Sequence, residues 1–183
     1  MKLRCGVAAA IIPMIFACKI IAPNGGASQV TVENLRLANN EISGWAETGL
    51  NLTSFGYASV QGLSELEGLI DGGAAIYYEN GFASGILQEM KTQTSQTCAA
   101  WVMDFGTPEK AKQMVGVQRA NAASPLALPT LPDSIAFVND NISKAFGYDS
   151  KFYFEIRVGG IFDAASRHSQ LEIFMKTYFA KII

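Results

Sequence analysis

Histidine and cysteine are scarce in this chain of 183 residues, which has one histidine and three cysteines. These residues are common ligands of structural zinc, and three scattered cysteines do not give the paired spacings of such sites. A basic patch is also lacking, because 14 lysine and arginine residues face 16 aspartate and glutamate residues without an arginine-rich run. The sequence therefore predicts no metal site and no nucleic-acid partner.

Recognisable catalytic and cofactor motifs are equally lacking. Gly81–Gly85 reads GFASG, which differs from the G-x-S-x-G turn that carries a nucleophilic serine. Gly72 and Gly73 neither form a G-x-G-x-x-G motif nor follow a strand, so no nucleotide cofactor is indicated. The one histidine, His168, lies in a polar stretch that favours an exposed side chain over a catalytic base. We therefore predict no catalytic residue and no cofactor.

The first eighteen residues, MKLRCGVAAAIIPMIFAC, have the order of a bacterial lipoprotein signal. A positive start (Lys2, Arg4) precedes an apolar run of twelve residues, Cys5–Phe16, which is too short for a stable membrane anchor. The run ends in IFAC and resembles the lipoprotein box, with a small residue before the Cys18 that would receive lipid. We predict a signal peptide over 1–17; ordinary secretion with another cut, or a retained apolar N-terminus, are the alternatives.

Lipid on Cys18 would hold the rest of the chain outside the cytoplasm, in the bacterial cell envelope. Residues 18–40 are interpreted as a flexible tether, because the segment NGGAS at 24–28 offers no side chain that anchors a core. Cys98 lies in a predicted strand, which favours a small buried apolar residue. The content of 49% apolar and 16% charged residues suits one folded domain, which we place at 41–183.

Apolar spacing predicts the elements of the first half. Residues 63–80 have apolar side chains three and four apart, as on one face of a helix, and Asn80-Gly81 is a suitable stop. Alternation predicts strands over 82–91 and 97–105, joined as a hairpin. Thr107-Pro108 should then begin a helix that ends near Ala120.

The second half has a similar order. Short strands are predicted over 135–138 and 143–148, and a stronger one over 151–158, in which Tyr153, Glu155 and Arg157 point away from the apolar side. Asp163 should cap a final amphipathic helix. These elements predict an α+β fold, a mainly antiparallel sheet with helices packed on one face. A crude ββα duplication, 82–120 and 135–182, is a variant of this prediction.

The stretch ELEGLIDGGAAIYYENGF, residues 65–82, places three glycines in a helical pattern. Glycine inside a helix costs about 1 kcal/mol relative to alanine. The glycines could let another backbone approach closely, or Asp71 could cap a shorter helix that runs to Asn80. A third interpretation is a site where Gly72 and Gly73 let a ligand reach the backbone beside Asp71.

The same stretch resembles an uncharacterised bacterial family, a domain of unknown function whose members are often secreted or lipoprotein-like. The likeness covers residues 41–182 and implies an envelope α+β domain, without supplying an activity. It rests mainly on the pattern I-D-G-x-A-x-x-Y at Ile70–Tyr77, followed by G-F at Gly81-Phe82. Three shorter motifs fit the order of the same family: Gly44-Trp45, Asp104 with Thr107 and Ala111, and Lys151 with Tyr153.

Aromatic residues gather where the predicted helix and sheet meet, and their ordinary role there is the core. Some of them could instead line an apolar pocket with polar anchors. The candidate ligand-binding residues are Asp71, Gly72, Gly73, Tyr77, Trp101 and Tyr153. We therefore expect a lipid-anchored domain that binds a small apolar molecule or an envelope component without catalysis. A structural or protein-interaction lipoprotein is the alternative, and an envelope enzyme is the least favoured hypothesis.

Overall fold

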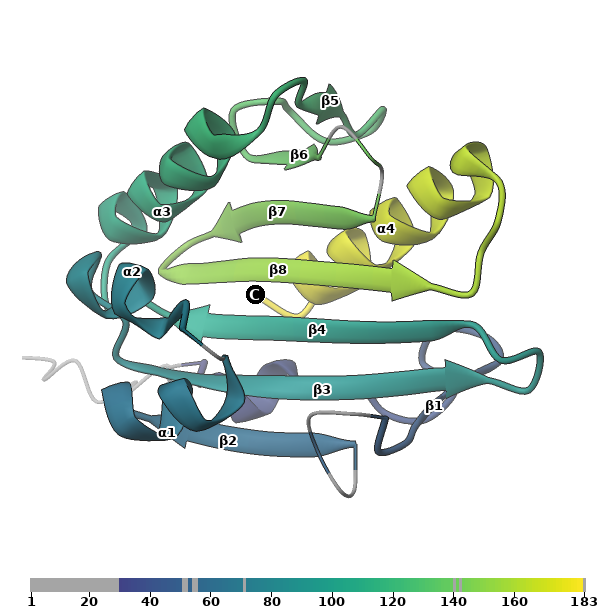
Figure 1. Ribbon diagram of the computed structural model, residues 1–183, viewed down its shortest axis with the longest axis horizontal. Helices are drawn as coiled ribbons and strands as arrows, with labels where there is room; N and C mark the ends of the chain where they lie inside the picture. The colour runs from purple at the N-terminus through teal and green to yellow at the C-terminus, as the bar shows by residue number, and fades with distance from the viewer. Residues whose placement is uncertain are drawn as a thin grey trace, which may run out of the picture.

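The computed structural model describes residues 30–182 except 51, 52, 54, 55, 71, 140 and 142. An eight-stranded sheet forms its centre, in the order β1-β3-β4-β8-β7-β6-β5 with β2 also paired to β3, and all pairs are antiparallel (Figure 1). The predicted α+β class and antiparallel sheet are confirmed. The strands are β1 (Trp45–Glu47), β2 (Tyr57–Gln61), β3 (Ser84–Thr92), β4 (Thr97–Asp104), β5 (Leu126–Ala127), β6 (Ala136–Val138), β7 (Lys144–Asp149) and β8 (Phe152–Gly159).

Helices cover both faces of the sheet, which corrects the prediction of helices on one face. The helical elements are η1 (Glu33–Leu35), α1 (Leu63–Leu69), α2 (Ala74–Glu79), α3 (Pro108–Asn121) and α4 (Ala164–Phe179). Phe154 of β8 belongs to the core on the α4 side, whereas its neighbour Tyr153 belongs to the core with α2 and α3. Both faces of β8 are therefore apolar along part of their length, and each needs a cover.

The predicted ββα duplication is present only as an order of elements. The runs β3-β4-α3 and β7-β8-α4 correspond, but α3 and α4 pack on opposite faces of β7 and β8. Two symmetric repeats would place their helices on the same face, so the second half does not repeat the first in space.

The segment before β1 is part of the core. Val32, Leu35 and Leu37 are buried against α4 and the sheet. Residues 30–40 therefore belong to the folded domain, which shortens the tether predicted over 18–40, while 18–29 lie outside the described residues. After this segment, β1 and β2 follow one another along the same edge of β3.

The predicted helix over 63–80 is two helices, α1 and α2. Gly72 has φ +67°, which breaks the helix between them, and Gly73 is the N-cap of α2. No backbone of another element lies within 4 Å of the position a Cβ would take at Gly68, Gly72 or Gly73. The glycines therefore end one helix and begin the next, rather than admitting a neighbouring backbone. Gly81, at φ +97°, ends α2 as predicted.

The caps of the two long helices are confirmed. The Thr107 hydroxyl accepts a hydrogen bond from the Lys110 amide at 3.4 Å, and Asp163 accepts one from the Ser166 amide at 2.7 Å. Cys98 is buried as predicted, and this burial raises the pKa of its thiol. None of the described helices combines the length and apolar character needed to cross a membrane.

Candidate functional site

Strand register arranges the sheet face under α1, α2 and α3 into rows of side chains. Leu87, Trp101, Glu155 and Phe146 lie directly opposite one another on β3, β4, β8 and β7. All four are buried. Figure 1 shows α1, α2 and α3 together over one end of this sheet face. This row is the inner row, at the edge of the helix-covered core.

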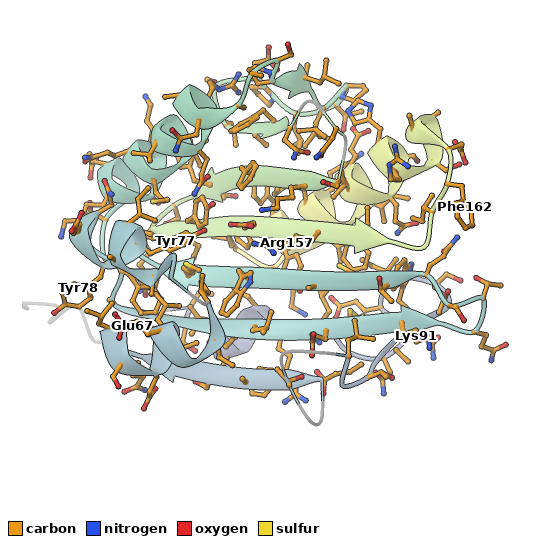
Figure 2. All side chains as sticks on the ribbon, in the orientation of Figure 1. Glu67, Tyr77, Tyr78, Lys91, Arg157 and Phe162 are labelled. Carbon is orange, nitrogen blue, oxygen red and sulfur yellow. The ribbon has the colours of Figure 1, made fainter. Side chains whose placement is uncertain are left out.

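The next row lies two residues further along the strands and is more open. It consists of Glu89, Ala99, Arg157 and Lys144, which we call the shelf. Glu89 is buried, but the Arg157 and Lys144 side chains are 45% and 34% exposed. In Figure 2, Arg157 lies on the open part of β8, away from α2, the helix that carries Tyr77 and Tyr78. The shelf is therefore the point where the sheet extends beyond its helical cover.

Glu155 joins the inner row to the shelf. Its Oε2 atom accepts a hydrogen bond from the Tyr77 hydroxyl at 2.7 Å and a long one from Tyr153 at 3.5 Å. Its Oε1 atom accepts Nε and Nη2 of Arg157 at 3.0 and 2.8 Å, and lies 3.4 Å from Nζ of Lys144. A carboxylate that is only 2% exposed is thus paired with two cations, from β7 and β8, and with two hydroxyl groups, from α2 and β8.

These contacts fix the charge of Glu155. Burial by itself raises the pKa of a carboxyl group, but the charges of Arg157 and Lys144 and the Tyr77 hydrogen bond outweigh it, so the pKa of Glu155 lies below its ordinary value. Burial, followed by the charge of Glu155, raises the pKa of both Tyr77 and Tyr153. The tyrosines therefore remain neutral donors to an ionised carboxylate.

A hollow of about 370 Å³ opens on the shelf. Its floor includes Ala99, and Leu50, which follows β1, stands at its border. Glu89 holds that border in place, since its Oε2 atom accepts hydrogen bonds from the Leu50 amide at 3.2 Å and from the Thr53 amide and hydroxyl at 2.8 and 2.7 Å. The lining residues are Leu50, Glu89, Thr97, Ala99, Arg157, Val158 and Gly159.

The structure brings together some of the sequence-predicted site residues. Tyr77, Trp101 and Tyr153 lie in the same core cluster, with the Tyr77 and Tyr153 ring centroids 5.9 Å apart. Their side chains are buried, and the hollow lies one row further out. Gly72 and Gly73 form the α1–α2 break, and the predictions for Asp71 and Cys18 lie outside the described residues.

Sequence reasoning missed Glu89, Lys144, Glu155 and Arg157 as site residues. The signal for two of them was present, because Glu155 and Arg157 interrupt an otherwise apolar strand on one face. Their convergence with Lys144 depends on the β7–β8 register, and the place of Glu89 depends on the pairing of β3 with β4. Neither register can be read from side-chain alternation alone.

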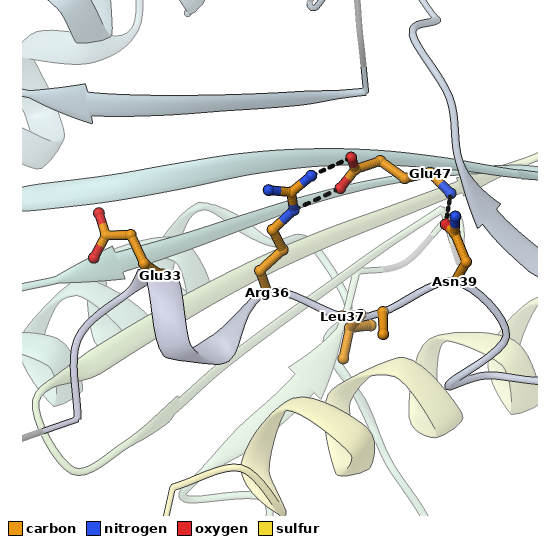
Figure 3. Close-up of a pocket in the computed structure, with 6 residues that line it drawn as sticks. Glu33, Arg36, Leu37, Asn39 and Glu47 are labelled. Carbon is orange, nitrogen blue, oxygen red and sulfur yellow. Dashed lines mark hydrogen bonds and ion pairs between the residues drawn. The ribbon is translucent and has the colours of Figure 1, made fainter.

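A second hollow, near the N-terminal segment, is lined by residues that pair with one another. Figure 3 shows Arg36 paired through both nitrogens of its fork with Glu47, while the Glu47 amide donates to Asn39 Oδ1 at 2.7 Å. Arg36 also lies over the Tyr57 ring, 4.0 Å from its centroid. These pairs attach the segment before β1 to the edge of the sheet, so the residues that line this hollow have a structural role.

Within the described residues, no group of three or more metal-ligating side chains converges. His168 Nε2 lies 2.9 Å from the Ala127 carbonyl oxygen, to which it donates, and thereby joins α4 to β5. Among the described residues, the shelf combines charged side chains with an open hollow, so it can recognise a ligand by charge and shape.

Comparisons with known proteins give one likeness in structure. No protein-family model matches the chain, and no curated protein matches it in sequence, so the family resemblance of residues 41–182 stays a prediction. A solved structure, the extracellular domain of PknH from Mycobacterium tuberculosis, matches with a TM-score of 0.54 and 11% sequence identity. The match covers 86% of this chain and 98% of that one. At 11% sequence identity, this match shows that the two proteins share a fold.

Tyr77→Phe should lower the free energy of unfolding by about 1–3 kcal/mol, since the variant leaves one oxygen of a buried carboxylate without its short hydrogen bond. Tyr78→Phe is the matched control, because Tyr78 is the next residue of the same helix and is 51% exposed. Urea unfolding of both variants measures the difference. Equal stability of the two variants would contradict the assigned role of Tyr77.

The ionised state of Glu155 predicts a dependence on pH. A carboxyl group whose pKa is lowered on folding stabilises the native state above its unfolded pKa, and this contribution is lost as the pH falls through the folded pKa. Wild type should therefore be more stable than Glu155→Gln at about pH 7, and the difference should shrink as the pH drops below about 4.5, its ordinary pKa. Urea unfolding of both proteins at a series of pH values tests this; a constant difference down to about pH 2 would contradict it.

Proposed function

We propose that this chain is a bacterial extracytoplasmic domain, anchored to a membrane by lipid on Cys18, that binds a small molecule or an envelope component without catalysis. The shelf carries this proposal, because charged side chains and an open hollow meet there at the end of a rigid sheet. Glu155 is buried, ionised and fully paired, which suits a positioning group rather than a proton-transfer group.

Two further observations support the location. Residues 1–18 have the charge, apolar run and terminal cysteine of a lipoprotein signal. The fold is also shared with a protein whose solved domain is extracellular. Both observations favour export, and the lipid itself is open to direct measurement.

Metabolic labelling with a clickable palmitate analogue tests the anchor. Wild type should take up label and stay in the membrane fraction, whereas Cys18→Ala should lose both properties. Cys5→Ala is the matched control, since Cys5 belongs to the predicted signal peptide and its variant should be labelled normally. Labelling of Cys18→Ala at the wild-type level would contradict the anchor.

Native mass spectrometry tests binding. The full chain is purified from its membranes in mild detergent, and we expect a reproducible added mass that disappears on denaturation. A bare monomer mass, obtained repeatedly from its own cells, would contradict a tightly held ligand.

A protein-interaction role is the second candidate, favoured by one surface residue. Phe162 is 97% exposed, although Arg167 fixes the turn around it by donating from Nη1 to the carbonyl oxygens of Ile161 and Phe162 at 3.0 and 2.9 Å. Aromatic residues, including phenylalanine, are enriched at the cores of protein interfaces, so an ordered turn that displays one suits a protein contact. A stable dimer or a stoichiometric partner in the native spectrum, lost in Phe162→Ala, would favour this candidate.

A further inference from the structure

Two cations on the shelf share one carboxylate. Arg157 and Lys144 both approach the same oxygen of Glu155, whose other oxygen accepts neutral hydroxyl groups. At this end of the shelf, two positive charges therefore share the one negative charge of Glu155. Glu155 takes two of the five N–H donors that an arginine carries, so Arg157 has further donors to offer.

The side chains of Arg157 and Lys144 are partly exposed to solvent, unlike that of Glu155. Glu155 lies in the buried inner row, whereas Arg157 and Lys144 lie in the open row with 45% and 34% of their side chains exposed. The two cations are direct register partners on neighbouring strands, which lie about 4.8 Å apart. One group with two or three oxygen atoms can therefore accept hydrogen bonds from both at once.

The other end of the shelf has the opposite charge. Glu89 lies across Ala99 from Arg157, two strands away, and is bonded to the Leu50 and Thr53 amides. An incoming anion would be repelled by Glu89 and attracted by Arg157, so the charges orient it. Its uncharged part would then lie over the methyl group of Ala99 and against Leu50.

We propose that the shelf recognises a carboxylate or phosphate group at Arg157 and Lys144, carried on a small apolar body that lies over Ala99. This inference rests on the proposed binding function and adds the chemical class of the ligand. Glu155 is a positioning residue in this arrangement, since it holds both cations in register without contacting the ligand.

Calorimetric titration of the full chain in mild detergent tests the inference with three probes of similar shape. Phenyl phosphate and phenylacetate carry the anion, and phenylacetamide is the neutral control. We expect binding of the two anions, weakened by added salt because screening reduces the attraction. Affinity for phenylacetamide should be at least tenfold lower. Equal affinity for phenylacetate and phenylacetamide would overturn the inference.

Variants locate the site. Arg157→Gln should weaken phenyl phosphate binding at least tenfold, and Arg157→Lys should give an intermediate loss because the planar fork is missing. Lys112→Gln, on the exposed side of α3, is the matched control and should bind as wild type does. Lys144→Gln provides a second test on β7 if Arg157→Gln fails to fold, and it should weaken binding at least threefold. Unchanged binding in a folded Arg157→Gln or Lys144→Gln protein would overturn the assignment.

The source of the anion is distinguished by a fourth probe, dihexanoyl-phosphatidylglycerol, used below its micellar concentration. Binding of this lipid in preference to phenyl phosphate would support a lipid headgroup as the ligand. The reverse preference would support a free small anion. Binding of neither one would overturn the inference.

Failure of this inference and failure of the proposed function have different signatures. A neutral or cationic mass retained in the native spectrum, together with no binding of the anionic probes, would overturn the anion class and leave the binding function intact. Absence of any retained mass and of any probe binding would overturn both.

Discussion

Replacing Trp45 with alanine is expected to lower the free energy of unfolding by about 3–5 kcal/mol. Trp45 is buried, and its ring meets Phe174 of α4 edge-to-face, with centroids 5.0 Å apart and an interplanar angle of 80°. The variant would leave a large cavity between β1 and α4 that the surrounding core cannot fill. Urea unfolding followed by circular dichroism measures the loss.

Phe162→Ala is the matched control for this experiment. It also removes an aromatic ring, but Phe162 is almost fully exposed, so its loss should change stability by no more than about 0.5 kcal/mol. A loss of less than about 1 kcal/mol for Trp45→Ala would contradict the view that β1 and α4 share one packed core.

Gln88→Leu should destabilise the fold by about 2–5 kcal/mol, because it removes a polar connection at the centre of the molecule. The buried Gln88 amide donates to the Leu37 carbonyl oxygen and to Glu47 at 2.7 and 2.9 Å. It accepts hydrogen bonds from the Leu37 amide and the Tyr178 hydroxyl at 2.9 and 3.1 Å. Leucine leaves these buried groups unpaired.

Two comparisons isolate the cause of the Gln88→Leu effect. Tyr178→Phe removes one of the four hydrogen bonds and should cost about 1 kcal/mol. Gln113→Leu removes a glutamine from the exposed face of α3 and should have little effect. Thermal unfolding ranks the three variants, and a Gln88→Leu protein as stable as Gln113→Leu would contradict the connecting role.

Local sequence signals predicted the elements whose boundaries they determine. Thr107-Pro108 and Asp163 begin α3 and α4 because cap residues satisfy free amides within the same few residues. The alternation along β4 and β8 is similarly local, so these strands and the α+β class follow from the sequence. Gly81 ends α2 because its positive φ suits the residue after a helix.

The remaining features depend on contacts between distant parts of the chain. The segment before β1 is core because Gln88, fifty-one residues after Leu37, satisfies the Leu37 backbone groups. Helices lie on both faces because Tyr153 and Phe154 alternate on a strand that is covered twice. The shelf exists because β3, β4, β8 and β7 align Glu89, Ala99, Arg157 and Lys144 in one row. A single sequence contains the residues but not this register.

Amide chemical-shift mapping of the wild-type full chain with phenyl phosphate tests the central claim, that the shelf is the binding surface. The predicted result is a set of saturable shifts centred on the amides of Ala99, Lys144 and Arg157, with little change around Arg36 and Glu47 in the second hollow. Shifts concentrated around Arg36 and Glu47, or no shifts at saturating probe, would contradict the claim.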